Sequence, residues 1–100
     1  MNYAIYCTDK PDHLSVRMDN RPAHVDYLNG LNAEGKLVLA GPTLGEDNKP
    51  TGSIVIVEAD SMEAAQTIAA NDPYAKAGLF ASVEIRGWNW VFNKPETTTA

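Results

Sequence analysis

The sequence contains one cysteine, few basic residues and no long hydrophobic run, and each shortage excludes a class of protein. The single cysteine, Cys7, excludes an internal disulfide framework. The longest aliphatic runs, residues 37–40 and 54–57, are far shorter than the ~20 apolar residues of a membrane-spanning helix. The first residues, Met1-Asn2-Tyr3, lack the basic stretch and apolar run of a secretory signal. We therefore expect a cytoplasmic protein.

Acidic residues outnumber basic ones, with 13 Asp and Glu against 8 Lys and Arg and a net charge of -5. The basic residues are scattered, whereas nucleic-acid-binding proteins usually concentrate them in a patch. The charge therefore disfavours nucleic acids and anionic membrane surfaces as partners. A chain of 100 residues fits one domain, and its hydrophobic content of 44% suffices for a small core.

The first half of the chain predicts a strand, a helical region and a second strand. Residues 2–8 are rich in strand formers and end at a turn signal, residues 9–12. Residues 13–34 read as helical, ended by Gly35. Because proline is tolerated mainly in the first helical turn, Pro22 predicts a break, with Asn20 or Arg21 capping a second helical piece.

The middle of the chain predicts a hairpin followed by a second helix. Residues 36–40 and 53–57 read as strands, the latter apolar enough for a central position, with Gly41-Pro42 and residues 45–50 in a long polar loop. Asp60, with glutamate three residues on, predicts a capping box. The expected buried stripe of this helix is Met62, Ala65, Ile68 and Ala69.

The last predicted strand, residues 79–92, changes the parity of its apolar positions after Gly87, which predicts a bulge there. Beyond it Trp88, Trp90 and Phe92 form an aromatic cluster that favours a partner surface. The polar residues 93–100 are expected to be a disordered tail.

Together the elements predict an α+β fold, a ferredoxin-like βαββαβ sandwich whose four-stranded antiparallel sheet carries both helices on one face. The strands have apolar residues on both faces. A second copy covering the open face is therefore expected, giving a homodimer.

Two residues stand out as candidates for proton transfer. His24 shares a predicted helix face with Leu28 and Leu31, and Asp72 follows the second helix. An imidazole oriented by a carboxylate is the minimum equipment for acid-base chemistry. The alternatives are structural: His24 as a core histidine, and Asp72 as an N-cap with Pro73 at the first helical position. Cys7, in an apolar strand, is expected to be a buried thiol.

Other kinds of site lack their motifs. His13 and His24 are too widely spaced, with only one cysteine, to indicate a metal site. The glycines form no phosphate-binding loop, and Ser53 lacks the context of a nucleophile elbow. We expect neither a metal nor a cofactor.

The sequence also resembles the YciI-like (YCII-related) family over about residues 1–92. The matching stretches are Met1-Asn2-Tyr3-Ala4-Ile5-Tyr6, Arg17, Arg21-Pro22-Ala23-His24, Glu34-Gly35-Lys36-Leu37, Ala40-Gly41-Pro42, Thr51-Gly52-Ser53, Asp72-Pro73-Tyr74 and Ala77-Gly78. The resemblance implies a dimeric α+β barrel, with two ferredoxin-like sheets packed face to face. It also implies a His-Asp pair between sheet and helices, which falls on His24 and Asp72.

The resemblance extends at the level of fold to muconolactone isomerases, and some relatives are assigned to dehydrochlorination of chlorinated hydroxyquinols. The implied reaction is proton-coupled elimination or isomerisation on a small hydroxylated ring, with His24 as base and then acid and Asp72 orienting it. Lys76, which departs from the family pattern, is either a surface lysine or a cation beside the developing oxyanion. The candidate substrate-binding residues are Ser53, Tyr74, Arg17 and Arg21. The rival hypothesis is a non-catalytic dimeric module that binds a metabolite or a protein.

Overall fold

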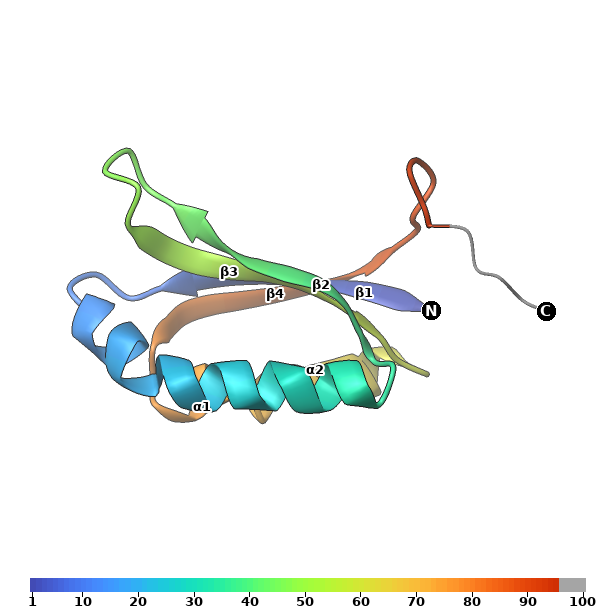
Figure 1. Ribbon diagram of the computed structural model, residues 1–100, viewed down its shortest axis with the longest axis horizontal. Helices are drawn as coiled ribbons and strands as arrows, with labels where there is room; N and C mark the ends of the chain where they lie inside the picture. The colour runs from blue at the N-terminus through green and yellow to red at the C-terminus, as the bar shows by residue number, and fades with distance from the viewer. Residues whose placement is uncertain (96–100) are drawn as a thin grey trace.

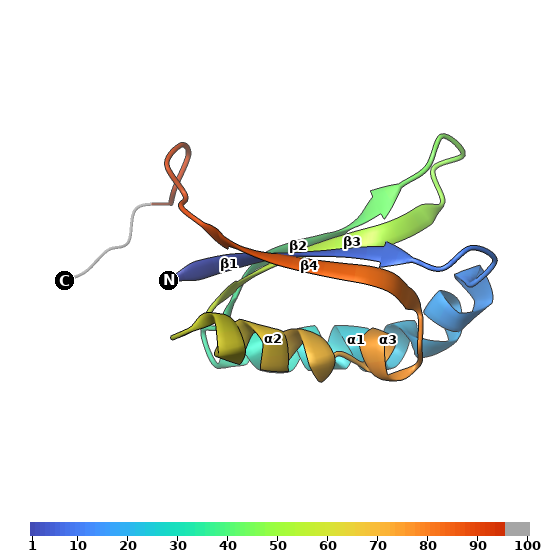
Figure 2. The ribbon, with the colours of Figure 1, turned by 180° about the vertical axis from the view of Figure 1, so that it is seen from behind.

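The computed structural model describes residues 1–95 and shows one antiparallel sheet with all its helices on one face (Figures 1 and 2). The four strands lie in the order β2-β3-β1-β4. The opposite face of the sheet is uncovered in both views. This confirms the predicted ferredoxin-like α+β fold. The elements are β1 (Asn2–Asp9), α1 (Leu14–Ala33), β2 (Leu37–Leu44), β3 (Pro50–Glu58), α2 (Met62–Ala70), α3 (Pro73–Lys76) and β4 (Phe80–Trp88).

The core lies between the two central strands and the helices. Ile5 and Cys7 of β1 are 2% and 4% exposed, and Val57 of β3 is fully buried. These side chains share the helix-facing side because residues two apart on a strand point to the same face. Ala65 of α2 packs against them. The predicted central position of the third strand and the predicted buried thiol of Cys7 are confirmed.

The first helix is continuous, so the predicted break at residues 20–22 is wrong. Pro22 lies inside α1, and Figure 1 shows the first turns of the helix inclined to the rest. A proline removes one backbone donor and bends a helix, but burial on both sides of the bend holds it together. Here Arg17 precedes the proline and His24 follows it, and both are buried.

Gly35 ends this helix as predicted. Its φ of 74° lies in the left-handed region that favours glycine. The Gly35 amide donates to the carbonyl of Asn32 (3.1 Å), and the Lys36 amide donates to that of Leu31 (2.9 Å). These two bonds form a Schellman motif, which satisfies carbonyls that the helix end leaves without partners.

Two further boundaries differ from the sequence prediction. β2 continues through Gly41 and Pro42 to Leu44, because β2 is an edge strand and an edge can accept proline, which donates no hydrogen bond. The cap of α2 is Ser61, not Asp60: the Ser61 hydroxyl accepts from the Ala64 amide at 3.1 Å. Met62, expected in the buried stripe, is 37% exposed.

The last strand ends at Trp88, short of the predicted residue 92. Its pairing with β1 runs unbroken through Gly87, opposite Tyr3, so the predicted bulge there is wrong; the register shift lies at Thr8/Asp9. The nearest atom to a Cβ at Gly87 would be the terminal methyl of Met1, which belongs to an exposed, flexible side chain that can move aside. The predicted tail lies largely in residues 96–100, outside the described part of the chain.

Of the predicted aromatic cluster, Trp88 and Trp90 form a ring pair at the end of the strand. The rings of Trp88 and Trp90 lie 5.5 Å apart, and Phe92 is 81% exposed. Its role as a partner surface stays a prediction. Within residues 1–95 no helix has the length and apolar character needed to cross a membrane.

Candidate active site

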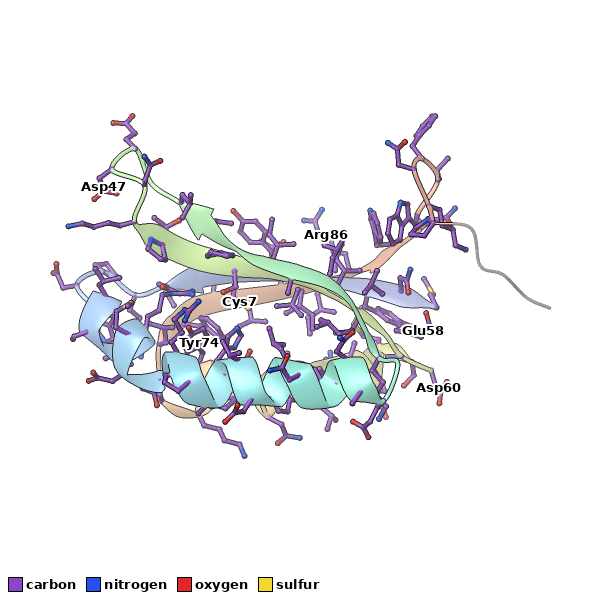
Figure 3. All side chains as sticks on the ribbon, in the orientation of Figure 1. Cys7, Asp47, Glu58, Asp60, Tyr74 and Arg86 are labelled. Atoms are coloured by element: carbon purple, nitrogen blue, oxygen red, sulfur yellow. The ribbon has the colours of Figure 1, made fainter. Side chains whose placement is uncertain are left out.

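A cleft of about 470 Å³ opens between α1 and the sheet. Figure 3 shows the labelled Tyr74 in this layer, whereas Arg86 projects from the opposite face of the sheet. The lining of the cleft combines polar and apolar side chains, the usual pattern of a small-molecule site. The polar lining residues are Arg17, Arg21, His24, Ser53 and Tyr74; the apolar ones include Met18, Val25, Leu28, Pro42 and Val55.

His24 lines the cleft and meets Asp72 behind it. The Nδ1 atom of His24 lies 2.8 Å from Oδ1 and 3.0 Å from Oδ2 of Asp72, and both residues are buried. Asp72 also caps α3, because its Oδ1 accepts from the amide of Tyr74 at 2.9 Å. Asp72 therefore caps α3 and contacts the imidazole of His24 at the same time.

This pairing leaves one imidazole nitrogen available to a ligand. A carboxylate at Nδ1 favours the tautomer with its proton on Nδ1, so Nε2 is the nitrogen that accepts or returns a proton. His24 lines the cleft. Among residues 1–95 no buried side-chain nitrogen or oxygen lacks a hydrogen-bond partner, and Nε2 has no protein partner among the bonds of these residues. Nε2 therefore keeps some exposure, on a residue that lines the cleft.

Tyr74 packs against the imidazole. Its ring lies 4.0 Å from that of His24 at an interplanar angle of 15°, and it meets Phe80 edge-on at 6.1 Å. Burial raises the pKa of Tyr74, and the nearby charges of Arg17 and Arg21 only partly offset this. The phenol is therefore protonated at neutral pH and available as a hydrogen-bond donor.

The side chain of Arg17 is held by the carboxylate of Asp9, a residue that the sequence did not indicate as part of a site. Its Nε and one terminal nitrogen donate to Asp9 at 2.7 and 2.9 Å, and the same terminal nitrogen donates to Ser53 at 3.0 Å. Burial alone would lower the pKa of Arg17, but the hydrogen bonds and charge of Asp9 raise it, so the side chain remains cationic. Its guanidinium lies 4.6 Å from the centre of the Tyr74 ring.

The sequence does not predict Asp9 as a site residue, because residues 9–12 indicate only a turn. Its signal is weak: a carboxylate at the end of an apolar strand, followed by a helix that carries an arginine. Ser53, which faces the cleft from β3, is 3% exposed. Its hydroxyl accepts from Arg17 and keeps its own hydrogen for a ligand.

Of the two alternatives for Lys76, the structure fits the surface lysine and not the cation beside the substrate. It is the last residue of α3, its side chain is exposed, and it does not line the cleft. Its expected contact with a substrate oxygen has no counterpart in this geometry. The structure thus brings together His24, Asp72, Tyr74, Ser53, Arg17 and Arg21. Residues 1–95 contain no cluster of three or more His, Cys, Asp or Glu suited to a metal ion.

The chain is similar in sequence to known proteins. The sequence model of the YCII-related domain family matches residues 1–89. The chain is 45% identical over 98 residues to Protein YciI of Escherichia coli O6:H1, covering 92% of this chain and 100% of that protein.

Solved structures extend the comparison. The chain matches 5-chloro-2-hydroxyhydroquinone dehydrochlorinase (TftG) from Burkholderia phenoliruptrix AC1100, a complex with 2,5-dihydroxybenzoquinone, with a TM-score of 0.81 and 42% identity over 89% of this chain and 94% of that chain. An antibiotic biosynthesis monooxygenase matches with a TM-score of 0.54 and 12% identity, covering 91% of this chain and 99% of that one. This second match shows shared fold alone.

Proposed function

The chain belongs to the YCII-related domain family, and we propose that it is an acid-base enzyme that eliminates or isomerises a small hydroxylated ring compound. The observation that carries the proposal is the buried His24–Asp72 pair, whose imidazole faces a cleft of about 470 Å³. The likeness to a dehydrochlorinase at 42% identity supports loss of HCl from a chlorinated hydroquinone or hydroxyquinol as the reaction.

The proposed elimination needs only proton transfers and a leaving group. One ring hydroxyl loses its proton as the carbon bearing chlorine gains one, which gives a ketone with an sp³ carbon. A second hydroxyl, conjugated to that carbon, then loses its proton as the C–Cl bond breaks. The net change is loss of HCl, and a chlorohydroxyquinol becomes a hydroxybenzoquinone without an oxidant.

In the proposed reaction each of the cleft residues has a separate role. His24 takes a hydroxyl proton at Nε2 and delivers it to the ring carbon, while Asp72 stabilises the imidazolium that forms between the two steps. Tyr74 and Ser53 donate hydrogen bonds to ring oxygens. The guanidinium group of Arg21 lowers the energy of the negative charge that develops on those oxygens in a partly apolar site, while Arg17, paired with Asp9, holds Ser53 in place.

We also propose that the protein functions as a homodimer and works in the cytoplasm. Tyr6, Leu39 and Ile54 are 49%, 43% and 37% exposed. The strand registers place them on the sheet face opposite the helices, where Tyr6 pairs with Ile54. Exposed apolar residues gathered on one sheet face are typical of an interface.

Substitution of His24 tests the acid-base role. With a chlorohydroxyquinol as substrate, we expect His24→Gln to lower kcat by at least ~100-fold, because general acid-base catalysis contributes ~10²–10⁴-fold. Chloride release and the absorbance of the quinone product measure the rate. His13→Gln is the matched control, since His13 lies outside the cleft and its Nδ1 contacts only the carbonyl of Pro11 (2.8 Å).

The outcomes separate the enzyme from its rival. A loss below tenfold in folded His24→Gln would exclude the general base. A wild-type protein that binds hydroxylated rings but releases no chloride and isomerises none of them would favour the non-catalytic binding module. Thermal unfolding of each variant keeps loss of turnover distinct from loss of fold.

A further inference from the structure

The two arginines of the cleft differ in what surrounds them. Arg17 is 4% exposed, its charge is compensated by the bidentate pair with Asp9, and a further bond joins it to Ser53. An anion placed beside Arg17 therefore meets a cation whose field is already largely cancelled. Arg17 orders the site more than it attracts charge to it.

Arg21 lies one helical turn further along α1, and it lines the same cleft. It is exposed and forms no ion pair with any carboxylate of residues 1–95. Because a guanidinium remains charged at any physiological pH, Arg21 places an uncompensated positive charge at the cleft.

Arg21 and Tyr74 line the same cleft. The positive charge of Arg21 acts to lower the pKa of this phenol, against the larger effect of burial. Leu28, Pro42 and Val55 line the same cleft. Apolar walls exclude water and strengthen the attraction between Arg21 and an anion in the cleft.

We propose that Arg21 is the specificity-determining residue of this site and that it selects a planar ring carrying an ionised oxygen over the neutral ring of the same shape. This inference rests on the proposed function and names its ligand class: hydroxyquinones and the enolates that lead to them.

Hydroxyl groups on quinones and on hydroquinones differ strongly in acidity, so a positive charge can distinguish the two kinds of ring. A hydroxyl on a quinone is conjugated through a C=C bond to a carbonyl, so it is a vinylogous carboxylic acid and ionises below neutral pH. A hydroquinone hydroxyl ionises near the ~10 of an ordinary phenol. In the proposed elimination the substrate is therefore neutral and the product anionic. Arg21 favours the product side and the enolate-like states before it.

Equilibrium binding tests this inference without turnover. The probes are 2,5-dihydroxybenzoquinone, ionised at pH 7.5, and 2,5-dimethoxybenzoquinone, a ring with the same oxygen pattern that cannot ionise. Calorimetry on the full chain gives Kd for wild type, Arg21→Gln and Arg21→Lys. The control is Lys36→Gln, which removes one exposed positive charge outside the cleft.

We expect Arg21→Gln to weaken binding of the dihydroxy compound by about tenfold or more, the usual effect of losing a charge-assisted hydrogen bond. Arg21→Lys keeps the charge but not the fork of donors, and recovers part of the affinity. Lys36→Gln changes Kd less than threefold. The dimethoxy compound, if bound, is insensitive to Arg21.

Two results would overturn the inference: a change below threefold in Arg21→Gln, or an equal loss for both probes. Either can occur while wild-type chloride release persists, in which case the proposed reaction stands and its ligand selection has another source. Conversely, Arg21-dependent binding in a protein that releases no chloride supports the ligand class and refutes the dehydrochlorination.

Discussion

The phenol ring of Tyr74 lies parallel to the imidazole of His24, with the ring centres 4.0 Å apart and the planes within 15°. The stack fixes the plane of the imidazole, and the Asp72 carboxylate at Nδ1 fixes its rotation within that plane. Tyr74 is in turn placed by the N-cap bond from its own amide to Asp72. The segment 72–74 therefore begins a short helix and orients the candidate base at the same time.

Two substitutions of Asp72 separate these roles. In Asp72→Asn the amide oxygen at the Oδ1 position still accepts from the Tyr74 amide, so the cap survives, and the NH₂ group takes the place of Oδ2, 3.0 Å from Nδ1 of His24. The neutral amide stabilises an imidazolium less than a carboxylate does, and its NH₂ group disfavours a proton on Nδ1. We expect kcat to fall by about 100-fold or more with a loss of about 1 kcal/mol in unfolding free energy, and ¹⁵N chemical shifts of His24 to report the tautomer.

Asp72→Ala removes the cap as well. Loss of an N-cap costs about 1 kcal/mol, and a buried histidine without its partner costs ~1–3 kcal/mol more, so this variant is the less stable of the two. Urea unfolding measures the difference. If Asp72→Asn keeps more than a third of the wild-type kcat, the carboxylate does not orient a working imidazole.

The buried Asp9–Arg17 pair predicts a large stability effect. Asp9→Asn leaves a buried guanidinium without its counter-charge, which typically costs ~3–5 kcal/mol. Arg86 and Glu84 form the matched exposed pair, 3.0 Å apart with side chains 80% and 62% exposed. Glu84→Gln is expected to cost less than ~1 kcal/mol, since solvent screens such pairs.

Chemical denaturation of both variants decides this prediction. Equal losses in Asp9→Asn and Glu84→Gln would mean that solvent reaches Arg17 and that the cleft is wetter than the structure implies.

Local sequence signals predicted the element order and the central strand because hydrophobic periodicity and Gly35 act over a few residues. They failed where tertiary contacts override local preference. Pro22 bends α1 without ending it, since burial on both sides holds the helix together. Gly87 signalled a bulge, yet the pairing of β4 with β1 runs through it without a shift. Neither effect is visible without the neighbouring element.

The sequence predicted part of the candidate site and missed the part that depends on contacts between elements. His24 and Asp72 stood out by chemistry and by resemblance, and the fold brings them together. Asp9 was missed because its partner lies on another element. Lys76 followed Tyr74 closely in sequence, but α3 turns its side chain to solvent. Proximity along the chain is a poor guide to which side chains face a cleft.

The uncovered sheet face yields a prediction on assembly. Ile54→Lys places a charge among apolar residues on that face, where it would be desolvated in a dimer. We expect this variant to run as a monomer in size-exclusion chromatography with light scattering, while the wild type runs as a dimer. Met62→Lys is the control, since Met62 has the same 37% exposure but lies on α2, on the other side of the sheet.

If both variants remain dimeric, the copies associate through another surface, and the aromatic cluster of Trp88, Trp90 and Phe92 becomes the next region to substitute. A monomeric wild type would refute the homodimer.

The buried thiol of Cys7 makes stability fall in mild alkali. Burial, reinforced by the negative charges of Asp72 and Asp9, raises the pKa of Cys7 from 9.0 to about 12. The folded protein therefore keeps this proton in a pH range where the unfolded chain releases it. Its stabilising contribution is complete below pH 9 and is lost as pH rises toward 12, because the native state then binds more protons than the unfolded state.

Cys7→Ala isolates this contribution. The pKa values of Tyr27 and Tyr74 are also raised by burial, but from an ordinary value of 10.0, so between pH 9 and 10 Cys7 dominates. We expect wild type to lose about 1 kcal/mol more than Cys7→Ala between pH 8 and 10 in urea unfolding. Parallel curves for the two proteins would mean that the thiol ionises near its ordinary pKa in the folded state. The layer beside Asp72 would then be hydrated, and the low-dielectric setting that strengthens the His24–Asp72 pair would be absent.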